Sequence, residues 1–346
     1  MFYDRIARPL LFRLPPETAH NLARNVLKTQ APWRILGAPH TSSPRLECRI
    51  GGLSIGNPIG LSAGFDKNAE ALAGLSQLGF GYMLVGSILP KPRAGNPKPR
   101  LLRLKEQESL LNCYGLPSDG LQRILPRLEQ WSRKAAGMPP VIANIDCPDV
   151  ETYGAVLAKV EPYVHAVEIG TQCPNNRDDN GEFNTKAALE NLLAQVSRQH
   201  RKPLFVKLLP YNNEAERQNR LELAEIAAHY EVDGISLPGT ERVPTDRLSL
   251  GYGQSSGRMA FEKTLETVKD LAHATKGRVA IRANGGISTG EDVFHVLAAG
   301  ASSADVLTSF IYRGWSLPRR LQTELLDQLD MHHLRSISEI GPHLSR

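Results

Sequence analysis

Two lysines in apolar surroundings are the first residues of this sequence that could do chemistry. Lys207 lies inside the apolar run 204–208, and Lys67 follows Asp66 after another short apolar stretch. A buried ammonium group is costly without an anionic partner, so a lysine inside such a run indicates a bound anion. For Lys67, a simple ion pair with Asp66 explains the position equally well.

Glycines near the end of the chain could surround a phosphate group. Gly285-Gly286 follows one short apolar run, and Thr308 ends the next. Backbone N–H groups without bulky side chains can bind a dianion. Taken alone, the glycine pair would be only a tight turn. Together with an internal lysine, it indicates a phosphorylated aromatic cofactor, because a cation can stabilise the negative charge of a reduced flavin ring.

The elements that must position these residues alternate along the chain from about residue 50. Short continuous apolar runs are typical of buried parallel strands, so eight runs separated by helical segments predict an α/β protein with a (β/α)8 barrel. Residues 91–120, rich in Pro and Gly, are expected to form an inserted loop over the barrel mouth. The predicted strands are 58–63, 82–86, 141–145, 166–170, 204–208, 234–237, 279–284 and 305–308, and the predicted helices include 69–78, 185–199, 214–229, 261–275 and 290–299.

The N-terminal segment differs from the rest of the chain in charge. Residues 1–36 hold +4 of the total net charge of +5, because arginines interleave there with apolar residues on two predicted helices separated at Pro15-Pro16. Such helices can lie in a membrane interface. A helical hairpin packed on the barrel is the alternative. The remaining chain is nearly neutral, which argues against a nucleic-acid partner.

Composition excludes several other classes of protein. The chain has 346 residues, of which 41% are hydrophobic and 22% charged, enough for a large folded domain. The four cysteines form no CxxC pair, so we expect neither a disulfide scaffold nor a metal site. No apolar run is long enough to span a bilayer, and no secretory signal is recognisable, so the expected compartment is the cytoplasm.

From about residue 2 to residue 314, the chain resembles the class 2 dihydroorotate dehydrogenases. The matching segments are LPPETAH (14–20), NPIGLSAGFDK (57–67), GNPKPRLLRL (95–104), SGR (256–258) and GGI (285–287). The resemblance implies an FMN-binding barrel over residues 41–346. It also implies a helical pair over residues 1–40 that docks on the cytoplasmic side of the membrane, as a peripheral protein, and admits a quinone as electron acceptor.

The resemblance also implies roles for individual residues. Cys173 falls at the position of the general base, which removes a proton beside the carbon whose hydride passes to flavin N5, and Lys67 is the second catalytic residue. The implied FMN contacts are Ala63, Gly64, Lys67, Ser87, Asn144, Lys207, Gly257, Gly286, Leu307 and Thr308. The implied substrate contacts are Lys67, Asn112, Tyr114, Gly115, Leu116, Asn175, Gly239 and Thr240.

Departures from the family gather on the substrate side. Cysteine replaces the usual serine base, and Gly170 and Gly239 stand where the family has asparagines that bind the pyrimidine ring. An unpaired buried polar group costs about 1–3 kcal/mol, so losing two amides changes recognition substantially. We therefore expect a small polar substrate altered from dihydroorotate, desaturated at a C–C bond. Authentic dihydroorotate oxidation in pyrimidine biosynthesis, a flavin barrel acting on tRNA, and an inactive membrane-binding relative remain alternatives.

Overall fold

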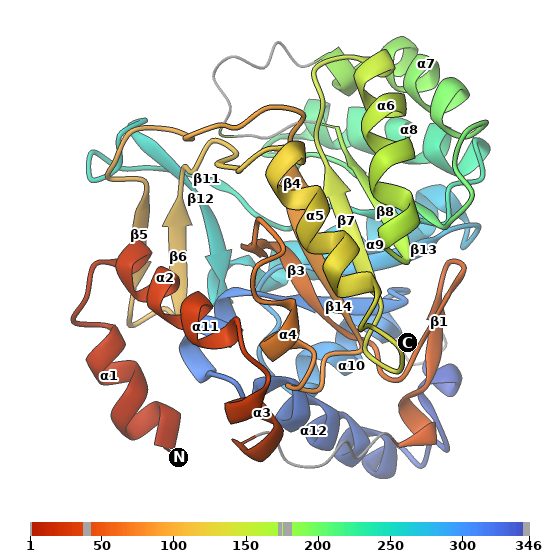
Figure 1. Ribbon diagram of the computed structural model, residues 1–346. Coiled ribbons are helices and arrows are strands. Elements are labelled where there is room, and N and C mark those ends of the chain that lie inside the picture. The colour runs from red at the N-terminus through yellow and green to blue at the C-terminus, as the bar shows by residue number, and fades with distance from the viewer. Residues whose placement is uncertain (1, 37–42, 172–174, 176–181, 342–346) are drawn as a thin grey trace.

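The centre of the molecule is a closed barrel of eight parallel strands (Figure 1). The computed structural model describes residues 2–36, 43–171, 175 and 182–341. The strands succeed one another around the barrel in chain order, which confirms the predicted (β/α)8 fold. They are β3 (Ile59–Asp66), β4 (Tyr82–Ile88), β7 (Val141–Ile145), β8 (Ala166–Gly170), β9 (Leu204–Lys207), β10 (Gly234–Ser236), β13 (Ala280–Asn284) and β14 (Ser303–Val306).

Helices cover the outside of the barrel, and side-chain caps fix where several of them begin. Asp149, Thr185, Asn213 and Thr289 each accept a hydrogen bond from a backbone N–H of the first turn. The helix predicted over 69–78 is only the single turn α4 in the structure. Just before it, Asp66 accepts hydrogen bonds from the backbone N–H groups of Glu70 and Ala71. The covering helices are α4 (Leu72–Leu75), α5 (Leu121–Ser132), α6 (Val150–Val160), α7 (Lys186–Val196), α8 (Glu214–His229), α9 (Phe261–Thr275), α10 (Gly290–Ala298), α11 (Thr308–Arg313) and α12 (Leu317–Met331).

A second, four-stranded antiparallel sheet stands at the mouth of the barrel. Its order is β11 (Arg242–Pro244), β12 (Tyr252–Gly257), β6 (Ser109–Asn112) and β5 (Leu101–Leu104). The prediction of a loop over 91–120 is therefore wrong in part, because β5 and β6 form a hairpin there. Its partner β12 lies more than 140 residues later in the chain, where a local sequence pattern gives no sign of it. The last predicted strand, 305–308, is also displaced, since Thr308 begins α11.

The opposite end of the barrel is closed by the hairpin of β1 (Cys48–Ile50) and β2 (Leu53–Ile55). Ile50 and Ile55 pack there against Leu84 and Ile142 from inside the barrel. This end of the barrel is therefore filled by apolar side chains, and a ligand-binding site is expected at the opposite end, the barrel mouth. Short 3₁₀ turns complete the chain at Pro44–Leu46, Glu161–Tyr163, Glu182–Asn184, Arg258–Ala260 and Ile337–Glu339.

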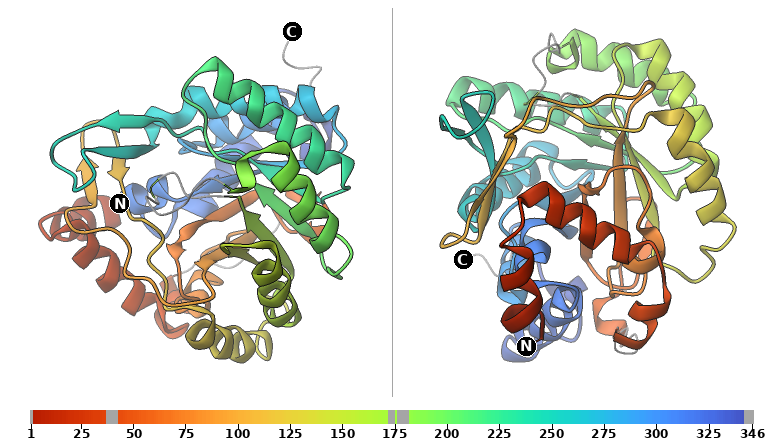
Figure 2. Two further views of the ribbon diagram at one scale, coloured as in Figure 1. Left: turned by 90° about the horizontal axis from the view of Figure 1, so that it is seen from above. Right: turned by 60° about the vertical axis from the view of Figure 1, so that its left-hand side comes forward.

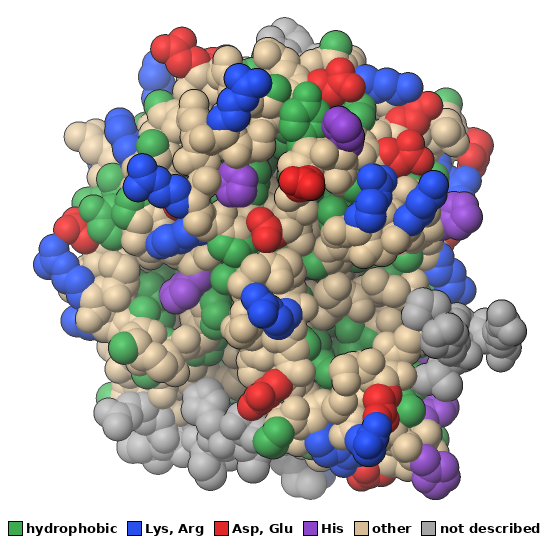
Figure 3. Space-filling view, turned by 90° about the vertical axis from the view of Figure 1, so that its right-hand side faces the viewer, with side chains coloured by type: hydrophobic (Ala, Val, Ile, Leu, Met, Phe, Trp, Pro, Cys, Tyr) green, Lys and Arg blue, Asp and Glu red, His purple; other side chains and the backbone are tan. Residues whose placement is uncertain are grey.

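The N-terminal helices lie beside the mouth sheet, along one side of the barrel (Figure 2). A π-helical turn (Tyr3–Ala7) leads into α1 (Arg8–Leu11), and α2 (Pro16–Leu27) and α3 (Ala31–Leu36) follow. The expected break at Pro15-Pro16 separates α1 from α2, whereas α3 was not predicted. The side of the molecule turned away from these helices carries acidic and basic side chains interspersed (Figure 3). None of the helices in the described ranges is long and apolar enough to cross a membrane.

Candidate active site

A cavity of about 700 Å³ opens at the C-terminal ends of the barrel strands. Strand ends form its inner part, the β5–β6 hairpin forms one wall, and helices α1 and α2 line its outer part. This volume is typical of small-molecule sites, and the position is that of active sites in (β/α)8 enzymes. One continuous space therefore reaches from the barrel to the N-terminal helices.

All ten residues predicted to contact FMN line this cavity. They come from six of the barrel strands or the loops after them, and from the end of β12. The structure thus brings together Ala63, Gly64, Lys67, Ser87, Asn144, Lys207, Gly257, Gly286, Leu307 and Thr308.

Two glycines let backbone segments approach one another where a phosphate group would bind. At Gly257 (φ +88°), a Cβ atom would lie 2.4 Å from the carbonyl oxygen of Glu108. At Gly286 (φ +73°), it would lie 2.4 Å from the amide nitrogen of Phe261. The buried hydroxyl of Ser309, which also lines the cavity, has no hydrogen-bond partner among the described residues. Close backbone and an unsatisfied hydroxyl fit the phosphate of FMN.

Lys67 is held inside the cavity rather than paired with Asp66. Its Nζ donates to the carbonyl oxygen of Gly64 at 2.5 Å and lies 4.6 Å from the centroid of the Tyr114 ring. Burial, together with the nearby Arg24 guanidinium, lowers the pKa of Lys67 to about 8. A bound anion would restore the preference for the charged ammonium.

Two asparagine amides face each other on the substrate side. Asn175 Nδ2 lies 3.4 Å from Asn112 Oδ1, and Asn175 Oδ1 is buried without a hydrogen-bond partner among the described residues. Asn96 fixes this arrangement, because its Nδ2 donates to the carbonyl oxygens of Asn175 at 2.8 Å and of Cys113 at 2.9 Å. The other substrate-side predictions that line the cavity are Lys67, Tyr114, Gly115, Leu116 and Thr240.

Gly239 does not line the cavity, unlike the other predicted substrate contacts. Its amide N–H donates to the carbonyl oxygen of Asn284. The side of Gly239 that would carry a Cβ atom is packed against α9, because that atom would lie 2.3 Å from the Thr264 nitrogen. Reading strand ends from the sequence gave no sign of this orientation. The wall at this point is formed instead by Pro238 and Thr240.

Asp146 is a cavity residue that sequence reasoning missed. Its Oδ2 lies 3.2 Å from the position a Cβ atom would have on Gly170, so its carboxylate stands beside the place of the missing amide. Asp146 is one residue beyond the end of β7. The available signal was therefore an acidic residue directly after a correctly predicted strand.

Cys173, the predicted base, lies outside the described residues, so its role stays a prediction. Thr171 and Asn175, on either side of residues 172–174, are both buried, and Asn175 lines the cavity. In the described ranges no cluster of three or more His, Cys, Asp or Glu side chains could hold a metal ion.

The outer part of the cavity is apolar and lies under α2. His20 packs edge-on against Phe65, with ring centroids 5.1 Å apart. Burial, with help from Lys67 and Arg24, lowers the pKa of His20 to about 3, so this imidazole is neutral. Leu22 and Val26 line the same region. A largely apolar ligand fits this part better than a charged one.

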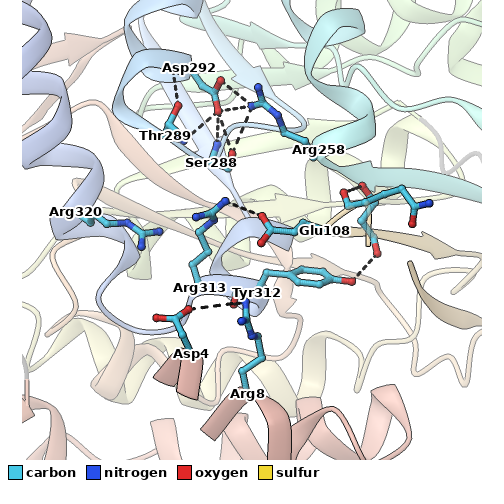
Figure 4. A network of polar contacts seen from close by, with 12 residues as sticks. Asp4, Arg8, Glu108, Arg258, Ser288, Thr289, Asp292, Tyr312, Arg313 and Arg320 are labelled. Carbon is cyan, nitrogen blue, oxygen red and sulfur yellow. Dashed lines mark hydrogen bonds and ion pairs between the residues drawn. The ribbon is translucent and has the colours of Figure 1, made fainter. Parts of the chain in front are cut away.

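Polar contacts join the N-terminal helix to the elements around the cavity (Figure 4). Arg8 donates to the carbonyl oxygen of Tyr312 at 3.2 Å, and the Tyr312 hydroxyl donates to that of Ser109 at 2.9 Å. Arg313 pairs with Glu108 at 2.7 Å. Helix α11 is thereby tied both to α1 and to the β5–β6 hairpin.

A closed parallel barrel with close-packed glycines and two lysines at the strand ends fits the class of FMN-dependent oxidoreductases. Residues 45–329 match the family described as dihydroorotate dehydrogenase. A dihydroorotate dehydrogenase (quinone) from Cereibacter sphaeroides is 34% identical over 328 residues, covering 92% of this chain and 91% of that protein. One from Methylococcus capsulatus is 34% identical over 333 residues, covering 92% and 97%. The chain belongs to the dihydroorotate dehydrogenase family.

A solved structure agrees with this assignment. The dihydroorotate dehydrogenase of Eimeria tenella in complex with ferulenol superposes with a TM-score of 0.83 at 29% sequence identity, covering 94% of this chain and 95% of that chain. Its ligand-free form gives the same TM-score at 30% identity.

Proposed function

We propose that this enzyme desaturates a C–C bond of a small polar substrate that differs from dihydroorotate, with FMN as cofactor. Membership of the family makes the protein an FMN-dependent dehydrogenase that acts on a CH–CH group with a quinone as acceptor. The observation that carries the altered substrate is the carboxylate of Asp146 beside Gly170.

A carboxylate and an amide recognise different partners. An asparagine side chain both donates and accepts hydrogen bonds, whereas an ionised carboxylate only accepts them. A carbonyl group on a substrate ring, which could accept a hydrogen bond from an amide N–H, would face another acceptor in the Asp146 carboxylate. Leaving such a group unpaired costs about 1–3 kcal/mol, and Gly239 supplies no side chain to compensate. This wall therefore favours a substrate that presents an N–H or other donor.

The remaining residues divide the chemistry between binding and proton transfer. Bound FMN supplies hydride acceptance and onward electron transfer. We assign proton removal to Cys173, whose thiol needs a smaller pKa shift than a serine hydroxyl to act near neutral pH. The amides of Asn112 and Asn175 orient the substrate. The ammonium groups of Lys67 and Lys207 stabilise negative charge that develops in the cavity.

Dihydroorotate itself is the second candidate substrate. The paired amides of Asn112 and Asn175 favour it, and so do the printed names of the relatives. Anaerobic mixing of the yellow holoprotein with dihydroorotate separates the two. Flavin bleaching at about 1–10³ per second would establish dihydroorotate as the substrate, because these are ordinary enzymatic rates. Bleaching by another small CH–CH compound, with dihydroorotate much slower, supports the altered substrate.

We also propose that residues 1–40 form a membrane-docking unit on the barrel of residues 41–346. Six of the eight exposed large hydrophobic side chains among the described residues lie between Phe2 and Val26. Arginines share these helices, so apolar and cationic groups could meet lipid tails and phosphates together. The cavity extends beneath the same helices, which would let a quinone enter from the membrane. The proposed location is peripheral, on the cytoplasmic side, without a nucleic-acid partner.

A further inference from the structure

Three ionisable side chains meet inside the barrel at the floor of the cavity. Glu168 on β8, Arg282 on β13 and Asp305 on β14 are at most 2% exposed. The Arg282 guanidinium donates to Glu168 Oε2, and its Nη1 lies 3.6 Å from Asp305 Oδ2. Branched apolar residues usually fill this layer of a (β/α)8 barrel. Burying charges here is costly, so the cluster calls for a role besides packing.

Two aromatic side chains pack against the cluster. The Tyr82 hydroxyl donates to Asp305 Oδ1 at 2.5 Å. Its ring has room because Gly60 has no side chain, since a Cβ atom there would lie 2.2 Å from the ring. The Phe205 ring lies 5.3 Å from the Arg282 guanidinium carbon. Because its three ionisable side chains are buried, contacts inside the cluster are little screened.

One contact leads from the cluster to the cofactor side. Asn144 Nδ2 donates to Glu168 Oε1 at 2.8 Å, and Ser236 Oγ donates to the other carboxylate oxygen at 3.1 Å. Because an ionised carboxylate only accepts hydrogen bonds, it fixes which end of the amide faces it. Asn144 lines the cavity, and none of the described residues donates to its Oδ1.

We infer that Glu168, held by Arg282, is a positioning residue that orients Asn144 so that the amide oxygen is presented to FMN. The oxidised isoalloxazine ring carries one N–H group, at N3, which an amide oxygen can bind. Arg282 and Ser236 both donate to Glu168 Oε2, which leaves Oε1 to accept from Asn144, while Asp305 and Tyr82 hold the guanidinium side of the cluster in place. The inference rests on the FMN part of the proposed function, and it does not depend on the identity of the substrate.

Two double variants test the role of the acceptor at residue 168. Glu168→Gln/Arg282→Met keeps a carbonyl oxygen that can accept from Asn144, whereas Glu168→Leu/Arg282→Met does not. Both variants remove the ion pair and carry the same substitution at residue 282. Neither therefore leaves a buried guanidinium without its carboxylate partner. Apoprotein is titrated with FMN and followed by flavin fluorescence and by the visible absorption band. We expect the Gln variant to bind within about twofold of wild type, and the Leu variant at least about tenfold more weakly with a shifted band.

The outcomes separate this inference from the function on which it rests. Equal FMN affinities in the two double variants, or a Leu variant that binds like wild type, would overturn the role of Glu168. Wild-type apoprotein that does not bind FMN would overturn the flavin function instead. Thermal melting of each apoprotein checks folding. If the double variants do not fold, Asn144→Leu serves in their place, because it leaves the ion pair intact. Unchanged FMN affinity and spectrum in that variant would also overturn the inference.

Discussion

Glu17 of α2 and Arg100 before β5 form a two-point ion pair, with Nε–Oε1 and Nη2–Oε2 distances both 3.0 Å. Arg100 Nη1 also donates to the carbonyl oxygen of Asn96, the residue whose side chain holds Asn175. A continuous set of hydrogen bonds thus runs from the N-terminal helix to the substrate side of the cavity.

Glu17→Gln should lower the free energy of unfolding by about 1 kcal/mol at pH 7, at the upper end for a partly exposed pair because the geometry is two-pronged. Burial acts to raise the pKa of Glu17, but hydrogen bonding and charge from Arg100, with Lys98, lower it overall. Because the folded-state pKa is lowered, the ionised carboxylate stabilises the folded protein at pH values above the unfolded-state pKa of about 4.5. This stabilisation is lost as the pH falls below that value. Denaturant unfolding should therefore show a difference at pH 7 that shrinks below pH 4.5. A constant difference would contradict the ion-pair account.

The barrel could be predicted from sequence because each buried strand is a short continuous apolar run, and the resemblance to the family supplied the FMN contacts. The mouth sheet could not, because β5 and β6 become strands by pairing with β12, far away in the chain. Sequence also gave no sign that Gly239, unlike the other predicted substrate contacts, does not line the cavity. Which way a backbone faces at a strand end depends on the helix packed against it, here Thr264 of α9.

Lys67 should make the binding of anionic ligands depend on pH near 8. Burial lowers its pKa to about 8, so the ammonium that attracts the anion is lost as the pH rises through that value. The dissociation constant of an anionic substrate analogue, measured by perturbation of the flavin spectrum, should rise about tenfold per pH unit above 8. Lys67→Arg is the control, because a guanidinium stays protonated over this range and should remove the pH dependence even if binding is weaker. Flat binding between pH 7 and 10 in wild type would refute the assignment.

Cys173→Ala should slow flavin reduction by the true substrate about 10²–10⁴-fold, the usual effect of losing a general base. FMN content and ligand binding should stay close to wild type, because proton removal is the step affected. Stopped-flow bleaching under anaerobic conditions measures the rate. Cys113→Ala is the matched control, since that thiol is buried in an apolar cluster with Leu111 and Leu248 and is not assigned to the chemistry. A Cys173→Ala rate within threefold of wild type would exclude this base.

Exposed apolar residues of α1 and α2 should carry membrane binding. Leu10→Ser/Leu22→Ser removes two side chains that are 56% and 47% exposed, so folding should be little affected. We expect weaker co-sedimentation with anionic vesicles and slower turnover with a long-chain quinone, while bleaching of the flavin by substrate stays unchanged. Met331→Ser provides the control, because that residue is 67% exposed but lies at the end of α12. Vesicle binding that both variants retain in full would show that the segment is only structural.

The pair Asp146 and Gly170 gives the sharpest test of the altered substrate. A side chain added at Gly170 alone would meet the Asp146 carboxylate at 3.2 Å, so Gly170→Asn needs Asp146→Gly beside it. The double variant places an amide where the carboxylate now stands and removes the negative charge. We expect anaerobic flavin bleaching by dihydroorotate to be at least about tenfold faster in the double variant than in wild type, if the wild-type wall lacks a donor for the ring carbonyl. Tenfold corresponds to one regained hydrogen bond of about 1.4 kcal/mol. Asp146→Gly alone separates loss of the charge from gain of the amide. Fast bleaching of the wild-type flavin by dihydroorotate, with no gain in the double variant, would instead show that the Asn112 and Asn175 amides suffice for that substrate.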